Sequence, residues 1–180
     1  MIMEMHESGK RVYLKTPLMK DSAALAAMAS DPKVASLVAD EGEFPFPYRM
    51  ENARYFIKYA KAARAERLEY HFGVFLENER RLIGMAGIYL IDREQKTGRI
   101  GFWLNPGYWG VGYAHEAVAI LLDFAFGKMG LDSVYAVTFG SNERSRALLS
   151  RLGFRHTATE ASGLVYLMER QGWEKMRKNI

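Results

Sequence analysis

Residues 102–116 read FWLNPGYWGVGYAHE, a glycine-rich turn between a predicted strand and a predicted helix. A helix that begins at such a turn presents backbone N–H groups without intrahelical partners, together with the positive end of the helix dipole. Both features favour a phosphate or pyrophosphate group. Gly110 and Gly112 allow the backbone to approach such a ligand where a Cβ atom would collide. The stretch therefore predicts a phosphate-binding turn.

Three interpretations of this turn compete. A dinucleotide-binding fingerprint requires a parallel strand–helix–strand unit with an acidic residue at the end of its second strand. Here the preceding strand belongs to an antiparallel meander, and Asp132 comes before the next predicted strand, which counts against that interpretation. A P-loop requires Gly-Lys-Ser/Thr, which does not follow the glycines. A plain connection, in which the glycines only turn the chain, stays open on this stretch alone.

The elements around the turn predict a mixed α/β (α+β) fold. Three apolar runs joined by short polar turns predict an antiparallel meander over residues 71–76, 82–91 and 99–104. Before the meander we expect a strand at 11–14 and helices that begin after Asp21, after Asp31 and before Tyr55. After the turn we expect a helix from 114 to 126, a strand at 134–138, a short helix at 143–151, and strands near 154–157 and 165–169.

The composition limits the classes of function. The 180 residues include no cysteine, which excludes thiol nucleophiles and cysteine-ligated zinc, and we expect no metal. The first ten residues lack an apolar segment, and the longest apolar stretch of the most hydrophobic region ends at Asp123, so we expect a soluble, cytoplasmic protein with no membrane partner. The net charge of +4 suits a phosphate-rich ligand. Because no Lys/Arg run is present, we do not expect nucleic acid as a partner.

A second motif lies farther along the chain. Residues 142–145 read NERS and lead into Leu152-Gly153-Phe154. With these two motifs in this order, the chain resembles the GCN5-related N-acetyltransferase (GNAT) superfamily, whose pyrophosphate motif Gln/Arg-x-x-Gly-x-Gly/Ala is matched by residues 109–114. The resemblance implies a mixed, mostly antiparallel central sheet that is splayed at the acetyl-CoA site and flanked by helices.

The resemblance covers about residues 10–170, so we expect a single N-acetyltransferase domain over residues 1–180. The pieces DPKV, FPFPY, ENARYFI and LIGMAGIYLID are similar to the RimJ/RimL branch, which contains ribosomal-protein N-terminal acetyltransferases. The implied reaction transfers an acetyl group from acetyl-CoA to a primary amine, on a protein N-terminus or on a small molecule. The alternative is a catalytically inactive, acyl-CoA-binding sensor or scaffold. A monomer and a homodimer are both open.

The resemblance also implies which residues bind acetyl-CoA. In this family, backbone groups of the splayed strand hold the pantetheine arm, and an N–H group near Leu104 would face the developing oxyanion. The implied cofactor-binding residues are Phe102, Trp103, Leu104, Trp109, Gly110, Val111, Gly112, Tyr113, Ala114, Asn142 and Ser145. Further candidates for the ribose phosphate are Arg144, Arg146, Arg151 and Arg155, with a solvated basic helix face as the alternative for at least two of them.

The amine attacks the thioester directly in this family, so the protein supplies positioning, an acid and a base rather than a nucleophile. Ser145 matches the family's serine and is the candidate catalytic acid, and a helix-cap role for its hydroxyl is the alternative. Glu160 is the candidate catalytic base. The other groups that could accept the proton are His71, His115, Glu116 and the acids of residues 40–43.

Three residues depart from the family's pattern. Trp109 stands at the head of the pyrophosphate motif, and Arg99 stands where members of the branch often carry Glu. Leu149 stands where other branches place a tyrosine proposed as the acid that protonates the thiolate. The last two departures leave the assignment of the acid and the base open.

The segment EFPFPY at residues 43–48 predicts an acceptor site. Phe44, Phe46 and Tyr48 alternate in sequence, so an extended segment would aim all three side chains to one side as substrate-binding residues. Such a ledge would contact an apolar part of the acceptor, while the acids of residues 40–43 attract its ammonium group. Packing of the three aromatic side chains onto the second helix is the alternative.

Overall fold

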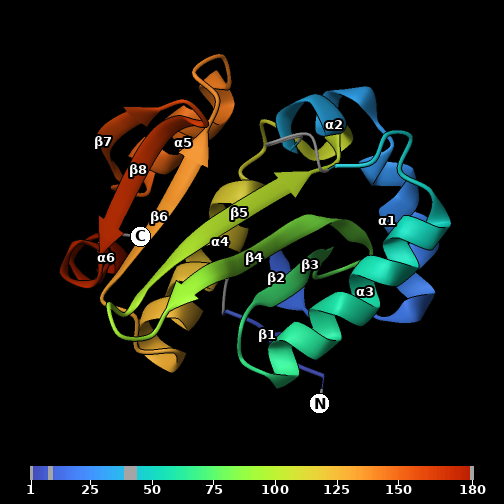
Figure 1. The fold of residues 1–180 in the computed structure, drawn as a ribbon, viewed down its shortest axis with the longest axis horizontal. Coiled ribbons are helices and arrows are strands. Elements are labelled where there is room, and N and C mark those ends of the chain that lie inside the picture. Colours follow the sequence, from blue (N-terminus) through green and yellow to red (C-terminus); the bar gives the residue numbers. More distant parts are fainter. Residues whose placement is uncertain (1, 8–9, 39–43, 179–180) are drawn as a thin grey trace.

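The computed structural model describes residues 2–7, 10–38 and 44–178. Its centre is an eight-stranded sheet in the order β1-β2-β3-β4-β5-β6-β8-β7 (Figure 1). Neighbouring strands are antiparallel except β5 and β6, which run parallel. The strands are β1 (Glu4–Met5), β2 (Val12–Lys15), β3 (Tyr70–Leu76), β4 (Leu82–Asp92), β5 (Thr97–Leu104), β6 (Ser133–Thr138), β7 (Arg155–Glu160) and β8 (Gly163–Glu169).

Helices cover both faces of this sheet (Figure 1). The bounds are α1 (Ser22–Ala29), α2 (Pro32–Val38), α3 (Met50–Ala65), α4 (Tyr113–Asp123), α5 (Glu143–Arg151) and α6 (Arg170–Arg177). Helices α1 and α3 pack on one face, over a core that includes Phe75 and Met85. Helix α4 packs on the opposite face, and its core also takes Leu149 of α5 and Trp173 of α6. None of the helices in the described ranges is long and apolar enough to cross a membrane.

The sequences of α4 and α3 explain why one helix is buried on most of its surface and the other on one side only. Helix α4 has six consecutive buried residues from Ala117 to Leu122, because it lies between the sheet and the C-terminal elements. Helix α3 buries only Ala53, Ile57, Ala60 and Ala63, which are spaced by three or four residues. This spacing gives one apolar stripe, as in a helix whose other side is exposed to solvent.

Strands β5 and β6 pair over only three residues. The three residues that begin at Thr97 lie beside the three that begin at Ser133. Beyond this point β5 pairs with β4 alone as far as Leu104, and β6 pairs with β8 as far as Thr138. The two strands therefore separate, and the sheet opens between them (Figure 1).

The predicted fold is confirmed, with differences at the ends of elements. The helix expected to run to residue 126 ends at Asp123 and continues as a π-helical turn over Phe124–Lys128. A wider turn keeps Phe124, Ala125 and Phe126 in the core while the chain leaves the helix. Strand β1 and helix α6 are additional elements. Helix α6 has only eight residues and buries Trp173 alone, so it is too short for its helical period to be recognised in the sequence.

Candidate functional site

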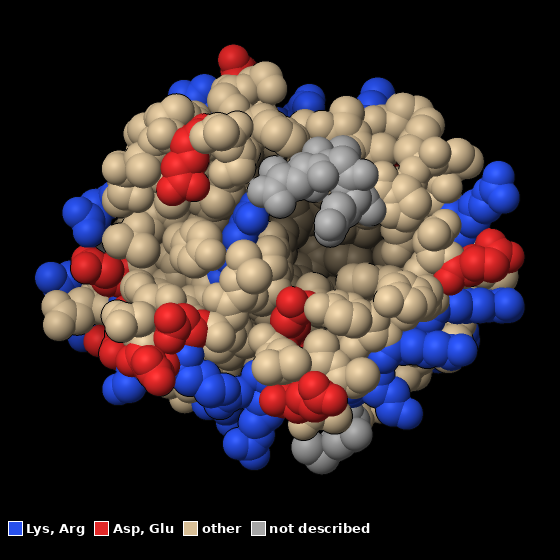
Figure 2. Space-filling model, in the orientation of Figure 1, with Lys and Arg blue, Asp and Glu red and all other residues tan. Residues whose placement is uncertain are grey.

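Two cavities meet where β5 and β6 separate. The sheet cavity, of about 570 Å³, lies on the face covered by α1 and α3. The turn cavity, of about 290 Å³, lies between the end of β5, the start of α4 and helix α5. The side chains that line both include Phe102, Trp103, Asn142 and Ser145. In the orientation of Figure 1, the surface is hollowed near its centre, and acidic and basic side chains are interspersed around it (Figure 2).

The start of α4 forms one wall of the turn cavity. Gly110 has φ 79° and Gly112, the N-cap of α4, has φ 93°, both in the left-handed region that favours glycine. No side chain caps this end of α4, and the first intrahelical bond is from Glu116 N–H to the Gly112 carbonyl. The N–H groups before Glu116 therefore face the turn cavity without helix partners, which is the arrangement that binds an anion.

A clamp from the N-terminal end of the chain holds this turn. Arg11 donates from Nη2 to the Val111 carbonyl at 2.8 Å, and its Nε and Nη2 donate to Glu116 Oε1 at 2.8 and 2.6 Å. The backbone N–H of Arg11 donates to Glu116 Oε2 at 2.7 Å. Arg11 is not among the residues expected from the sequence, because no local pattern links it to a turn about one hundred residues later. Glu116, weighed as a base, is thus engaged in the clamp.

The free edge of β5 forms the opposite wall. The N–H of Asn105 donates to the Ile83 carbonyl of β4 at 2.8 Å. Because N–H groups alternate in direction along a strand, those of Leu104 and Phe102 point away from β4, toward the opening beside β6. The Leu104 carbonyl on that side accepts a hydrogen bond from Trp109 Nε1 at 2.7 Å, which fixes the glycine turn to the strand.

Helix α5 brings the second motif to the same place. Asn142 is its N-cap and accepts a hydrogen bond from the Ser145 N–H at 3.1 Å. The cap is therefore the Asn142 amide and not the Ser145 hydroxyl, which corrects the alternative weighed for Ser145. Both residues line both cavities, so Ser145 lies at their junction.

Basic groups surround the turn cavity. Arg144 and Arg151 line it, and the Arg144 guanidinium lies 5.0 Å from the centre of the Trp109 ring. Burial lowers the pKa of His115, and the positive charges of Lys10 and Arg151 lower it further. Of the other two arginines, Arg146 donates to the Gly140 carbonyl and Arg155 pairs with Glu169 at 3.1 Å. The cavity therefore combines unpaired helix N–H groups with cationic side chains.

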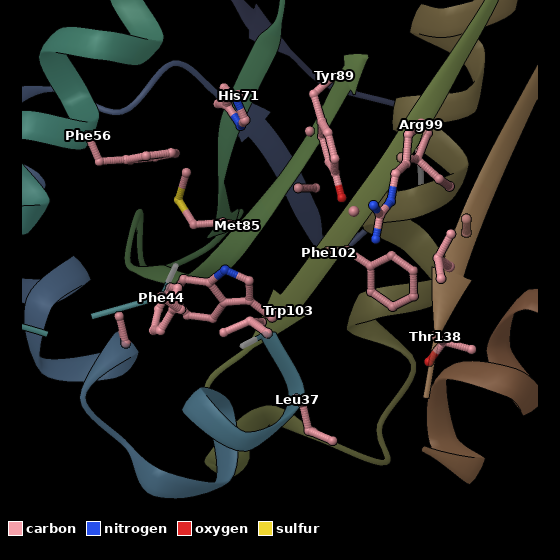
Figure 3. Close-up of a pocket in the computed structure, with 18 of the residues that line it drawn as sticks. Leu37, Phe44, Phe56, His71, Met85, Tyr89, Arg99, Phe102, Trp103 and Thr138 are labelled. Atoms are coloured by element: carbon pink, nitrogen blue, oxygen red, sulfur yellow. The ribbon is translucent and has the colours of Figure 1, made fainter. Parts of the chain in front are cut away.

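The sheet cavity is lined mainly by aromatic and apolar side chains (Figure 3). Trp103 and Met85 form its floor on the sheet, and Phe56 projects from α3. Figure 3 also shows His71, Tyr89 and Arg99 at the side of the cavity away from Leu37. Arg99 lies over the Tyr89 ring, 5.5 Å from its centre.

The predicted aromatic ledge is corrected in one respect. Phe44 and Tyr48 line the sheet cavity and stack with ring centres 5.0 Å apart. Phe46 is 59% exposed and is absent from the lining of the cavity. The chain bends at residues 44, 46 and 47, so the side-chain alternation of an extended strand does not apply. The acids of residues 40–43 lie outside the described residues.

The candidate acid–base groups are dispersed. Glu160 is exposed at the end of β7 and lines neither cavity, while His115 lines the turn cavity. His71 lies in the wall of the sheet cavity. Leu149 is completely buried in the core, so the place of the tyrosine acid of other branches is a packing position here.

Several known proteins are similar in sequence to this chain. Residues 11–155 match the family model described as acetyltransferase (GNAT) domain. The chain is 32% identical over 151 residues to the "uncharacterized N-acetyltransferase" YnaD of Bacillus subtilis, covering 84% of this chain and 83% of the relative. It is 26% identical over 145 residues to the "uncharacterized N-acetyltransferase" YoaA of the same species, covering 81% and 80%.

The fold is similar to that of RimJ from Mycobacterium smegmatis, solved in complex with CoA-disulfide. The TM-score is 0.83 at 18% identity, and the match covers 99% of this chain and 93% of RimJ. The expected mixed, mostly antiparallel fold is thereby confirmed, and RimJ, which belongs to the expected branch, is among the proteins that share it. A catalytically inactive sensor or scaffold is not favoured by these similarities.

Proposed function

Because this chain belongs to the acetyltransferase (GNAT) family and is an N-acetyltransferase, we propose that it transfers an acetyl group from acetyl-CoA to a primary amine. The acceptor amine is on a protein N-terminus or on a small molecule, and the reaction takes place in the cytoplasm. The observation that carries the proposal is the junction of the two cavities at the opening between β5 and β6. One cavity suits a phosphate-bearing thioester, and the other suits an organic amine.

Acetyl-CoA fits the turn cavity on three grounds. The N–H groups at the start of α4, beside Gly112, are donors for the pyrophosphate. Arg144 and Arg151 supply positive charge for the remaining phosphate. The edge of β5 that faces away from β4 supplies backbone groups for the pantetheine arm. We therefore propose that acetyl-CoA is bound by the residues predicted from the sequence, which are 102–104, 109–114, 142 and 145.

The chemistry then needs few side chains. The amine nitrogen attacks the carbonyl carbon, a C–N bond forms, the C–S bond breaks, and the thiolate takes a proton. The N–H of Leu104, at the opening, is the donor that we assign to the developing oxyanion. Ser145 lies at the junction of the cavities, and its hydroxyl is the group that we assign to protonate the thiolate. We expect Glu160 to contribute less, because it is exposed outside both cavities.

The central experiment is a thiol-release assay with acetyl-CoA, accompanied by calorimetry for acetyl-CoA binding. The acceptor panel consists of 2-phenylethylamine, spermidine, and hexapeptides that begin with Ser, Ala or Met. We expect saturable acetyl-CoA binding and release of thiol with at least one class of amine. A folded protein that binds no acetyl-CoA would contradict the proposed function.

We predict that Ser145→Ala lowers kcat by at least tenfold and leaves the affinity for acetyl-CoA nearly unchanged. An interaction made only in the transition state affects kcat rather than ground-state binding, and a loss of tenfold corresponds to about 1.4 kcal/mol. Asn142→Ala is the comparison, because removing the cap of α5 should weaken acetyl-CoA binding as well. An unchanged kcat in Ser145→Ala would assign the proton to another group or to solvent.

We predict that Phe44→Ala raises the KM for the acceptor several-fold, because Phe44 stacks on Tyr48 in the wall of the sheet cavity. Phe46→Ala is the matched control from the same segment, and its exposed ring should change neither the KM nor the stability. Thermal unfolding and acetyl-CoA calorimetry complete the comparison. Equal KM values for the two variants would remove this segment from the acceptor site.

A further inference from the structure

The sheet cavity contains a histidine whose partner is a carboxylate. Nε2 of His71 lies 2.7 Å from Glu69 Oε2, and the two side chains are 16% and 19% exposed. Phe56 meets the imidazole edge-on at 5.1 Å, and Tyr89 stacks on it with ring centres 6.2 Å apart. The ring is thus held by contacts on several sides, with its plane and its Nε2 position defined.

The partner on Nε2 determines the tautomer. A carboxylate can only accept, so the hydrogen on the neutral imidazole is assigned to Nε2 and the lone pair to Nδ1. The hydrogen bond from His71 is the main cause that lowers the pKa of Glu69, and a hydrogen bond from Tyr59 of α3 acts in the same direction. Burial is the main cause that raises the pKa of Tyr59, to about 12, so its phenol remains a donor. Tyr59, Glu69 and His71 therefore form a chain that leaves Nδ1 as the acceptor.

Glycines make room for the His71 imidazole and for the neighbouring Tyr89 ring. His71 of β3 pairs with Gly87 of β4, which pairs with Gly101 of β5, so all three lie in one row on the α1–α3 face. A Cβ atom at Gly87 would lie 2.9 Å from His71 Nδ1, and one at Gly101 would lie 2.8 Å from Tyr89 Oη. Both glycines line the sheet cavity. The His71 and Tyr89 rings therefore lie close against the sheet, in space that side chains at these two positions would fill, and both residues line the cavity that extends to Phe102 of β5.

The sheet cavity extends from His71 to the place where the thioester is proposed to bind. Adjacent strands are about 4.8 Å apart, so Nδ1, which reaches Gly87, lies about one strand spacing from Gly101. Gly101 precedes Phe102, whose N–H faces the opening between β5 and β6. Tyr89 Oη lies beside Gly101, so we place the amine nitrogen of an acceptor in the sheet cavity next to these rings, within reach of Nδ1 directly or through one water.

On these grounds we propose that His71 is the general base of the reaction, with Glu69 and Tyr59 as positioning residues. This inference rests on the proposed function. Nδ1 takes one proton from the acceptor's ammonium group, which frees the nitrogen lone pair for attack on the thioester carbon. The Glu69 carboxylate stabilises the imidazolium that forms, and His71 later returns the proton to solvent. The net reaction converts an ammonium and a thioester into an amide, a thiol and one released proton.

Other groups facing this imidazole bear on its protonation. Among the described residues these are the Glu69 carboxylate beside β3, the phenols of Tyr59 on α3 and Tyr89 on β4, and the Arg99 guanidinium on β5. Tyr48 and Tyr55 line the same cavity. Glu69 is the carboxylate in contact with the ring, so its removal should have the largest effect on the protonation of His71.

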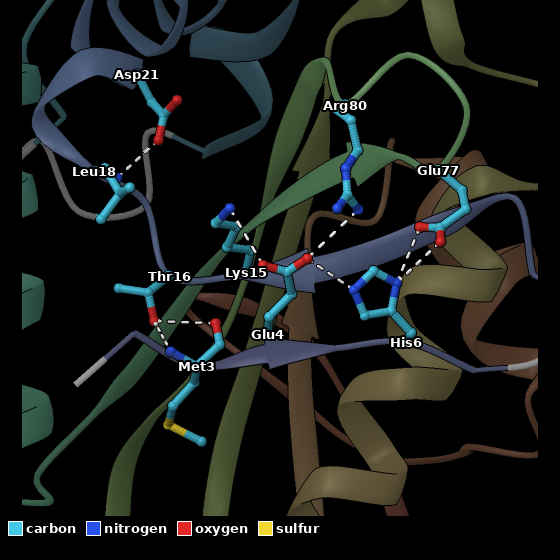
Figure 4. A network of polar contacts seen from close by, with 9 residues as sticks. All are labelled: Met3, Glu4, His6, Lys15, Thr16, Leu18, Asp21, Glu77 and Arg80. Atoms are coloured by element: carbon cyan, nitrogen blue, oxygen red, sulfur yellow. Dashed lines mark hydrogen bonds and ion pairs between the residues drawn. The ribbon is translucent and has the colours of Figure 1, made fainter.

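The test compares His71→Gln and Glu69→Gln with a matched control. His6, directly after β1, pairs through Nε2 with Glu4 at 2.8 Å and through Nδ1 with Glu77 (Figure 4). It lines neither the sheet cavity nor the turn cavity. His6→Gln therefore removes a similar histidine–carboxylate contact without touching the site. The kcat/KM is measured against pH with acetyl-CoA and the panel amine that the wild type acetylates fastest, and acetyl-CoA affinity is measured by calorimetry.

We expect His71→Gln to lower kcat/KM at neutral pH by about a hundredfold or more, within the range of general-base catalysis, and to abolish the acidic limb of the profile. Glu69→Gln should lower kcat/KM less and move the acidic limb of the pH profile to lower pH, because the imidazolium loses its counter-charge. His6→Gln and the acetyl-CoA affinities should be unchanged. In the wild type, ¹⁵N shifts of His71 should report the Nε2–H tautomer.

If His71→Gln keeps the kcat/KM of the wild type and the acidic limb of its pH profile, the assignment of the base is overturned and the proposed function still stands. An Nδ1–H tautomer in the wild type would overturn the assignment as well, even if His71→Gln fails to fold. Lack of acetyl-CoA binding by the wild type would instead contradict the proposed function itself.

Discussion

Replacing Gly112 with Asp is expected to weaken acetyl-CoA binding at least tenfold, which corresponds to about 1.4 kcal/mol. Gly112 is the N-cap of α4 and has φ 93°, a conformation that costs energy for any residue with a Cβ atom. The Cβ atom would lie 3.1 Å from Arg11 Nη2, so the clamp on Val111 must also adjust. The new carboxylate would stand beside the N–H groups proposed for the pyrophosphate and repel it.

The matched control for this variant is Gly130→Asp. Gly130 also has a positive φ, 73°, and a Cβ atom there meets nothing within 4 Å. It lies after the π-helical turn, far along the chain from the glycine turn, so the control reproduces the backbone strain and the added charge. Calorimetry with acetyl-CoA should show weak binding only for Gly112→Asp. If both variants fold and bind acetyl-CoA with equal affinity, the start of α4 does not bind the cofactor.

Local patterns predicted most of the fold. Asp31 and Pro32 were expected to start a helix, and the Asp31 carboxylate accepts the Lys33 N–H at 2.8 Å at the start of α2. The meander was predicted because its three strands are joined by short polar turns, which makes neighbours in sequence neighbours in the sheet. The position of the glycine turn between a strand and a helix followed for the same reason.

Contacts between distant segments could not be predicted in this way. The Arg11 clamp joins residues about one hundred positions apart, and the room that Gly87 and Gly101 leave for the His71 and Tyr89 rings depends on the register of three strands. His71 was one of several candidate bases because sequence alone does not say which titratable groups share a cavity. Phe46 was placed on the ledge by assuming an extended chain, whereas the segment bends.

The largest expected loss of stability comes from Leu149→Ala. Leu149 is completely buried in the core that includes α4, and it lines neither the sheet cavity nor the turn cavity. Removing three buried carbon atoms from a packed core costs about 2–5 kcal/mol, through lost burial and the void that remains. Urea unfolding of the variant should show this loss as a lower midpoint with an unchanged slope.

Its neighbour on the same helix separates packing from binding. Leu148 is only partly buried and lines the turn cavity, because successive helical side chains point in directions about 100° apart. Leu148→Ala should therefore reduce acetyl-CoA affinity more than stability, and Leu149→Ala the reverse, once binding is measured under conditions where both variants are folded. The same comparison tests the position of the tyrosine acid in other branches. If Leu149→Ala lowered kcat without lowering stability, residue 149 would face the reacting groups, and the assignment of thiolate protonation to Ser145 would have to be abandoned.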